Sequence, residues 1–137
     1  MTTVLFACVH NAGRSQMAAG FFNALADPAQ AHGISAGTQP AQHVHPEVLQ
    51  VMREGGIDLG GATPARLTDA VATGVQVLVT MGCGETCPFV PGVERIEWDI
   101  SDPKGQPLER VRAIRDDLRA RVEQLIATHG WQRPEAH

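Results

Sequence analysis

Hydrophobic and polar residues follow two different periods along the chain. A short apolar run leads into a polar, glycine-containing stretch, after which Met17, Phe21 and Leu25 recur at every fourth position. The first pattern is typical of a buried strand and the second of an amphipathic helix. A later run is almost entirely apolar, as a parallel strand covered on both faces should be. The predicted elements are the strands Val4–Val9 and Val75–Met81 and the helix Gln16–Ala26.

Weaker signals of the same kind complete the predicted fold. We expect a short strand at Gly33–Ala36. A helix is expected from Pro46 to the Gly55-Gly56 pair, with Leu49 and Met52 inward. A further helix is expected from Thr63-Pro64 to about Ala72, with Leu67 and Val71 on one side. We also expect a strand near the sheet edge with Ile96, Trp98 and Ile100, and a long surface helix from Pro107 to Thr128. This alternation predicts an α/β fold: one three-layer domain over residues 1–137, with a four-stranded parallel sheet flanked by helices. The tail Trp131–His137 is expected to be flexible.

Composition limits the function classes. The chain has 137 residues, 43% of them hydrophobic, which suits one globular domain. The first residues have neither a basic start nor a long apolar span, so we expect a cytoplasmic protein without a membrane segment. The net charge is −4 with both signs interspersed, which argues against nucleic acid or an anionic membrane as a partner. We expect a monomer.

The three cysteines are the residues that most need an explanation. Their number is odd, and cytoplasmic thiols stay reduced unless they are catalytic, redox-active or bound to metal. Cys8 and Cys83 both lie in segments at the ends of predicted strands, at the carboxyl edge where open α/β sheets bind ligands. The general alternative for Cys8, a small buried hydrophobe, is disfavoured by the spacing from Cys8 to Arg14 and Ser15.

The loop from Cys8 to Ser15 is suited to holding a dianion. Backbone amides of Val9, His10, Asn11, Ala12 and Gly13 are expected to bind the oxyanion together with Arg14. Arg14 can grip two oxygens, and the positive end of the helix favours Cys8 as a thiolate nucleophile. Ser15 can donate its hydroxyl to that sulfur, Asn11 can pin the loop, and Gly13 allows close approach or a positive φ. The side chain of His10 is either a surface group or a substrate contact.

Five segments carry a resemblance to a known family. VLFACVHNAGRSQMAAGFF, ISAGT, VLVTMGCGETCP, WDISDPKG and VRAIRDDLRARVEQLI resemble the thioredoxin-coupled arsenate reductases, which share the fold of low-molecular-weight protein tyrosine phosphatases. The likeness covers the chain from Val4 to Ile126. The cysteine-to-arginine loop alone indicates only the wider superfamily, and the two further cysteines narrow it to the reductases.

The resemblance implies a relay of thiols. Cys8 attacks arsenate, Cys83 then attacks the sulfur of Cys8 and releases arsenite, and Cys87 finally forms a disulfide with Cys83 that thioredoxin reduces. It also implies that Asp102, in an Asp-Pro step, protonates the leaving oxygen. Phosphate and sulfate would compete with arsenate, and no bound cofactor is needed. Many relatives place more residues between the last two cysteines than this chain does.

Several alternatives stay open at the level of sequence. Cys83 and Cys87 could be half of a zinc site, with His43 and His45 as the remaining ligands, but we expect no metal. A potassium site known in some relatives does not transfer, because Ala19 and Ala65 stand where its acidic residues would be. Three other functions compete: a monoester phosphatase without redox chemistry, a reductase coupled to mycothiol, and an oxyanion or arsenite sensor or carrier.

Overall fold

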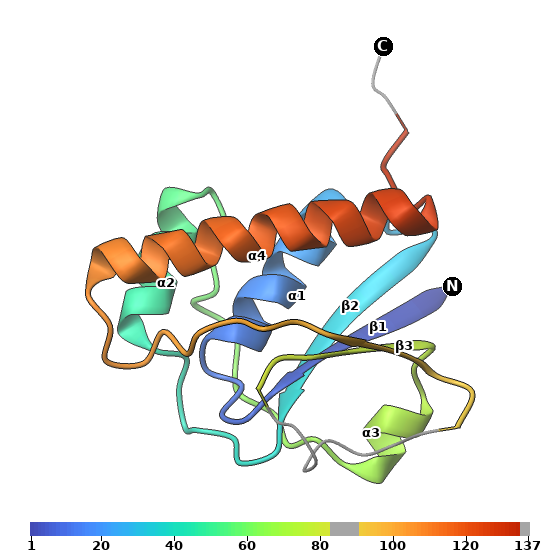
Figure 1. Cartoon of the computed structure of the whole chain (residues 1–137), viewed down its shortest axis with the longest axis horizontal. Coiled ribbons are helices and arrows are strands. Elements are labelled where there is room, and N and C mark those ends of the chain that lie inside the picture. The colour runs from blue at the N-terminus through green and yellow to red at the C-terminus, as the bar shows by residue number, and fades with distance from the viewer. Residues whose placement is uncertain (83–90, 135–137) are drawn as a thin grey trace.

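The computed structural model describes residues 1–82 and 91–134. Its sheet has four parallel strands in the order β2-β1-β3-β4. The strands are β1 (Thr2–Cys8), β2 (Ala31–Gly37), β3 (Val77–Thr80) and β4 (Glu94–Glu97). The helices are α1 (Arg14–Leu25), α2 (Pro46–Glu54), α3 (Asp69–Thr73) and α4 (Leu108–His129). Helices α1, α2 and α4 lie over one face of the sheet and α3 lies on the other, which confirms the predicted three-layer α/β fold (Figure 1).

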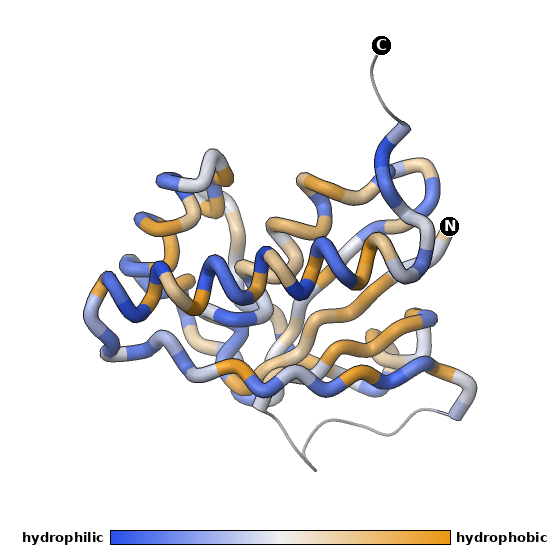
Figure 2. The backbone as a smooth tube through the Cα atoms, turned by 45° about the horizontal axis from the view of Figure 1, so that its top comes forward, coloured by the Kyte–Doolittle hydropathy of each residue, from blue (hydrophilic) through white to orange (hydrophobic). Residues whose placement is uncertain are grey.

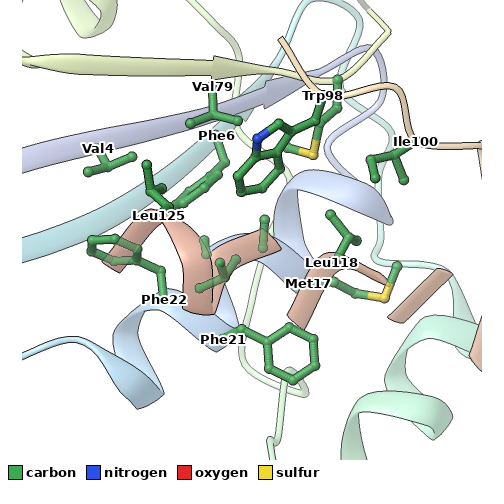
Figure 3. Close-up of a cluster of buried hydrophobic side chains, with 14 of the residues drawn as sticks. Val4, Phe6, Met17, Phe21, Phe22, Val79, Trp98, Ile100, Leu118 and Leu125 are labelled. Carbon is green, nitrogen blue, oxygen red and sulfur yellow. The ribbon is translucent and has the colours of Figure 1, made fainter. Parts of the chain in front are cut away.

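The two sheet faces are built from alternate residues of β1. Val4, Phe6 and Cys8 belong to the large core cluster under α1, α2 and α4, whereas Leu5 and Ala7 belong to a smaller cluster with Ala72 of α3. Figure 3 shows this larger cluster, where strand side chains meet those of α1 and α4. Figure 2 shows that the apolar stretches run through the central strands, while α4 alternates between apolar and polar turns. An apolar strand with both faces covered is the arrangement expected for a central parallel strand.

Most predicted elements form with shifted ends. Helix α1 begins at Arg14 rather than Gln16, β3 is shorter than 75–81, and the long helix forms as α4. The edge strand β4 contains Ile96, but Trp98 and Ile100 come after the strand and are buried beyond its end. They therefore fill the core below a segment that leads toward Asp102.

The helix predicted from Thr63-Pro64 is wrong. Residues 63–68 form no helix, and α3 begins at Asp69, after Thr68, whose hydroxyl accepts a hydrogen bond from Val71 N at 3.2 Å. The reason is pairing with the end of β2: Gly37 N donates to Ala65 O and Leu67 N donates to Gly37 O, both at 2.8 Å. A helix would have removed these long-range bonds.

The expected flexible tail is also corrected at its start. Trp131 is buried, its ring stacks on His129 at 4.3 Å, and it meets Phe22 edge-on at 5.8 Å. Its carbonyl accepts a hydrogen bond from Asp27 N. Residues 135–137 lie outside the described residues. Within the described part of the chain, no helix combines the length and apolar character needed to cross a membrane.

Candidate active site

The loop between β1 and α1 lies at the carboxyl edge of the sheet and is almost wholly inside the protein. Cys8, the last residue of β1, is 2% exposed. Asn11 and Ser15 are fully buried, and Arg14 is 8% exposed. Buried polar groups must be paired, so the positions of these side chains are set by their hydrogen bonds.

The backbone of this loop is held by its carbonyl groups. Every carbonyl from Cys8 to Gly13 accepts a hydrogen bond. The donors, in chain order, are Thr38 N, Gln39 N, Ala41 N, Gln16 Nε2, His45 N and Met17 N. Among the backbone amides of the loop, Asn11 N points toward the sulfur and donates to Cys8 Sγ at 3.3 Å.

Asn11 is the one non-glycine residue with a positive φ among residues 1–82 and 91–134, at 50°. Asparagine tolerates this left-handed conformation better than most residues. Its Oδ1 accepts from Ala65 N at 2.9 Å, which fixes which end of the amide is oxygen. Its Nδ2 therefore donates to Ser15 Oγ, at 2.6 Å. The Asn11 side chain therefore joins Ser15 to the segment at Ala65, rather than bonding to the backbone of the loop itself.

The hydroxyl of Ser15 links this asparagine to the cysteine. Ser15 Oγ lies 2.8 Å from Cys8 Sγ. Because its oxygen already accepts from Asn11, its own hydrogen is available for the sulfur. Cys8 Sγ thus faces two donors, Ser15 O–H and Asn11 N–H.

Helix α1 begins at this loop without a cap from any side chain of the described residues and without an acidic residue in its first turn. The first amides of a helix have no partner within it and carry partial positive charge. An anion bound between the loop and the helix would accept hydrogen bonds from these amides and would also balance their positive charge. Gly13 has φ −142°, so its value lies in close approach rather than in a positive φ.

Arg14 is held over the ends of β3 and of the segment after β4. Its Nη1 donates to Ile100 O at 3.1 Å, and its Nη2 lies 3.9 Å from Asp102 Oδ2. A Cβ at Gly82, which has φ +86°, would lie 2.5 Å from Arg14 Nη1. Gly82 thus leaves the room that the guanidinium occupies.

Asp102 lies in the segment after β4, near the Arg14 guanidinium. Its Oδ1 accepts from Lys104 N at 3.0 Å, which closes a tight turn around Pro103. Pro103 is buried, and a Cβ at Gly13 would lie 2.7 Å from its Cγ. Gly13 therefore allows the Asp-Pro turn to rest on the Cys8 loop.

The remaining predicted residues fall into two groups. Val9 and His10 are half-buried in the loop, and Ala12 is fully buried. Cys83 and Cys87 lie outside the described residues. In the parts of the chain that the structure describes, no group of three or more His, Cys, Asp or Glu side chains is arranged for a metal ion.

Sequence reasoning missed Gln16, Gly37 and Gly82. Gln16 is a buried amide bound to Asn11, and a Cβ at Gly37 would lie 2.5 Å from Val9 O. Each of the three matters because of a contact with another residue, and the hydrophobic and polar pattern of the sequence does not predict these contacts. A glutamine in the first turn of a helix gives no signal of its own.

These features place a buried cysteine-to-arginine loop at the carboxyl edge of a parallel α/β sheet. The chain matches the family described as low molecular weight phosphotyrosine protein phosphatase over residues 3–133, and it belongs to that family.

Its relatives include proteins named as arsenate reductases. A Halobacterium salinarum protein, provisionally named an arsenate reductase, is 40% identical over 88% of this chain and 88% of its own length. The glutaredoxin arsenate reductase of a Synechocystis species is 35% identical over 93% of this chain and 98% of its own. The solved thioredoxin-dependent arsenate reductase of Corynebacterium glutamicum is 35% identical with a TM-score of 0.82. That match covers 93% of this chain and 61% of the solved one.

Proposed function

We propose that this protein is a thioredoxin-dependent arsenate reductase with Cys8 as its nucleophile. The observation that carries the proposal is the buried Cys8 sulfur, which faces Ser15 Oγ at 2.8 Å and Asn11 N at 3.3 Å beside an uncapped helix start. The identity to proteins named as arsenate reductases supports the choice of substrate.

In the first step the Cys8 thiolate forms a bond to arsenic. One arsenate hydroxyl takes a proton from Asp102 and leaves as water. Arg14 and the loop amides hold the remaining oxygens and stabilise the charge that develops on them. The 3.9 Å approach of Asp102 to Arg14 supports this assignment, because it brings the acid to the residue that grips the anion.

In the second step the arsenic is reduced. Cys83 attacks the sulfur of Cys8, the sulfur–arsenic bond breaks, and its electron pair stays with arsenic, which leaves as arsenite. Cys87 then attacks Cys83, so that Cys8 is released as a thiolate and a Cys83–Cys87 disulfide forms. A dithiol of thioredoxin reduces that disulfide. The resemblance of VLVTMGCGETCP to the reductases supports these two roles, as does the Corynebacterium glutamicum relative.

Arsenate reduction coupled to thioredoxin, thioredoxin reductase and NADPH tests the proposal. Wild type should consume NADPH when arsenate is added, whereas Cys8→Ser and Cys83→Ser should not. Cys87→Ser should release about one arsenite per enzyme and then stop, because the first disulfide cannot be resolved. Steady turnover by Cys87→Ser would exclude the third thiol from the mechanism.

The same assay separates the alternatives. The family to which the chain belongs is named for phosphotyrosine hydrolysis, so a monoester phosphatase is the second candidate. It would hydrolyse an aryl phosphate without arsenate-dependent use of NADPH. The chain has no Tyr, four Phe and two Trp, which favours a small inorganic anion over a substrate ring that needs aromatic walls.

The choice of reductant is tested by replacing thioredoxin with other thiol systems. The Synechocystis relative is named for glutaredoxin, so glutathione with glutaredoxin, and mycothiol with its own glutaredoxin-like protein, replace thioredoxin in parallel reactions. Faster turnover with either system, undiminished in Cys87→Ser, would replace thioredoxin in the proposal. A sensor or carrier would bind arsenate stoichiometrically and consume no reductant.

A further inference from the structure

Gln16 makes two hydrogen bonds to one residue of the Cys8 loop. It lies in the first turn of α1 and is 5% exposed. Its Nε2 donates to Asn11 O at 3.1 Å and to Asn11 Oδ1 at 3.2 Å. Both bonds end on the residue that has the left-handed backbone conformation.

These bonds oppose the conformational cost of Asn11. A non-glycine residue with positive φ is maintained only when its surroundings hold it there. Gln16 ties the main-chain and side-chain oxygens of Asn11 together through one nitrogen. Ala65 N adds a donor to Oδ1 from outside the loop, so the asparagine side chain has one orientation.

That orientation decides what Ser15 does. With Oδ1 occupied by donors, Asn11 Nδ2 points to Ser15 Oγ, and the Ser15 hydroxyl hydrogen is left for Cys8 Sγ. The bonds run in one direction, from Gln16 through Asn11 and Ser15 to the sulfur. A substitution of Gln16 should therefore change the hydrogen bonding of the Cys8 sulfur.

We propose that Gln16 is a positioning residue that sets the reactivity of Cys8 by holding Asn11, without itself contacting substrate. The inference rests on the proposed role of Cys8 as a nucleophile and names the residue that prepares it. Glutamine is suited to the position because its amide donates to both Asn11 oxygens. A carboxylate of the same shape would repel them, and a thioether of the same length would donate to neither.

The test measures how fast the Cys8 thiol is alkylated when it is the one cysteine in the protein. In full-length protein carrying Cys83→Ser and Cys87→Ser, iodoacetamide can alkylate only Cys8, and the rate is followed from pH 5 to pH 9. Gln16→Met should lower the rate at pH 7 about tenfold, as expected for losing support of a hydrogen bond to a charged group, and should move the profile to higher pH. Gln16→Glu should do the same, and provides a second, isosteric variant if Gln16→Met does not fold.

Asn23 offers a matched control on the same helix. Its amide also makes two hydrogen bonds, in this case both to the backbone of Gly33: Nδ2 donates to Gly33 O at 2.9 Å, and Gly33 N donates to Oδ1 at 2.8 Å. Asn23→Leu should alter thermal stability but leave the alkylation profile unchanged. Profiles of the Gln16 variants that coincide with that of Asn23→Leu would overturn the proposal.

A double-mutant cycle tests whether Gln16 affects Cys8 through Asn11 and Ser15. If Gln16 acts through Asn11 and Ser15, Gln16→Met should change the alkylation rate much less in a Ser15→Ala background than alone. Independent, multiplicative effects would show that Gln16 acts by another path. Arsenate turnover by the parent enzyme is measured beside these variants, so that failure of the reductase assignment is recognised separately from failure of the Gln16 assignment.

Discussion

The two halves of the candidate site differ in how firmly they are held. The nucleophile loop, residues 8–15, has every carbonyl from Cys8 to Gly13 bonded and its polar side chains buried. The acid loop, residues 98–104, carries an Asp102 side chain that is 43% exposed, against 9% for Arg14. Asp102 is held by one tight turn and by a 3.9 Å approach to Arg14.

The difference suits the two tasks proposed for these loops. Stabilising a thiolate and a bound dianion depends on dipoles that are fixed before substrate arrives, which a buried loop provides. Giving a proton to a leaving oxygen needs an acid that reaches it in the complex, and such contacts commonly tighten only there. The halves touch where Pro103 rests on Gly13 and where Arg14 meets Ile100 O. Substitution of Arg14 should therefore affect anion binding and chemistry together, and substitution of Asp102 should affect chemistry alone.

Cys8→Ser should have the largest effect. Arsenate turnover should fall below detection, because a hydroxyl at this position is a far weaker nucleophile than a thiolate. Phosphate should still raise the melting temperature, since the loop and Arg14 remain. Measurable steady turnover in this variant would remove the nucleophile loop from the reaction.

Arg14→Lys should have the second-largest effect on arsenate turnover. A lysine lacks the planar guanidinium fork that allows Arg14 to bind Ile100 O and to grip two arsenate oxygens, so kcat/KM should fall about 100-fold through both a higher KM and a lower kcat. Arg119→Lys, on the exposed side of α4, serves as the charge-conserving control. An unchanged KM would separate Arg14 from anion binding.

Asp102→Asn should reduce kcat by about 100-fold, the usual contribution of a positioned general acid, with little change in KM. Asp99→Asn in the same loop is the matched control, because Asp99 is exposed and has no described bond to Arg14. Equal effects of the two substitutions would mean that the acid loop contributes only charge.

Gly13→Ala probes the contact between the halves. The added methyl would overlap Pro103 and displace the Asp-Pro turn, so kcat should fall about tenfold while phosphate binding persists. Gly61→Ala has open space around its Cβ and should leave kcat unchanged. A normal kcat in Gly13→Ala would show that the acid loop adjusts without Pro103 in place.

The smallest effect is expected outside both loops, at His129. Burial lowers the pKa of its ring, but hydrogen bonds to Leu125 O and to Glu94 outweigh burial and leave the pKa raised above its ordinary value. Its contribution to stability is therefore complete below the unfolded pKa of about 6.5 and is lost as pH rises through the folded value. His129→Gln should lower the melting temperature by about 2 °C at pH 6 and less at pH 9, with kcat unchanged. A difference that grows with pH would contradict this sign.

Part of the site was readable from local sequence and part was not. The Cys8-to-Ser15 spacing between an apolar run and a helical stripe located the loop, and the expected contact between Ser15 and the Cys8 sulfur is present. The Asn11 side chain instead bonds to Ser15 and Ala65, which the spacing did not indicate. The helix predicted from Thr63 failed because pairing of residues 65–67 with Gly37 outweighs the local Thr-Pro signal. Gln16 gave no signal, because its partner is a loop residue rather than a helical neighbour.

The sequence by itself determined the parallel α/β sheet, the order of strand, loop and helix around Cys8, and the chemical groups available there. Those features depend on the spacing of residues close together in the chain. Only the tertiary structure decided that Gly13 receives Pro103, that Gly82 leaves room for Arg14, and that Ala65 fixes the Asn11 amide. These contacts join residues far apart in sequence, and their energies depend on distances that exist only once the sheet has brought its carboxyl ends together.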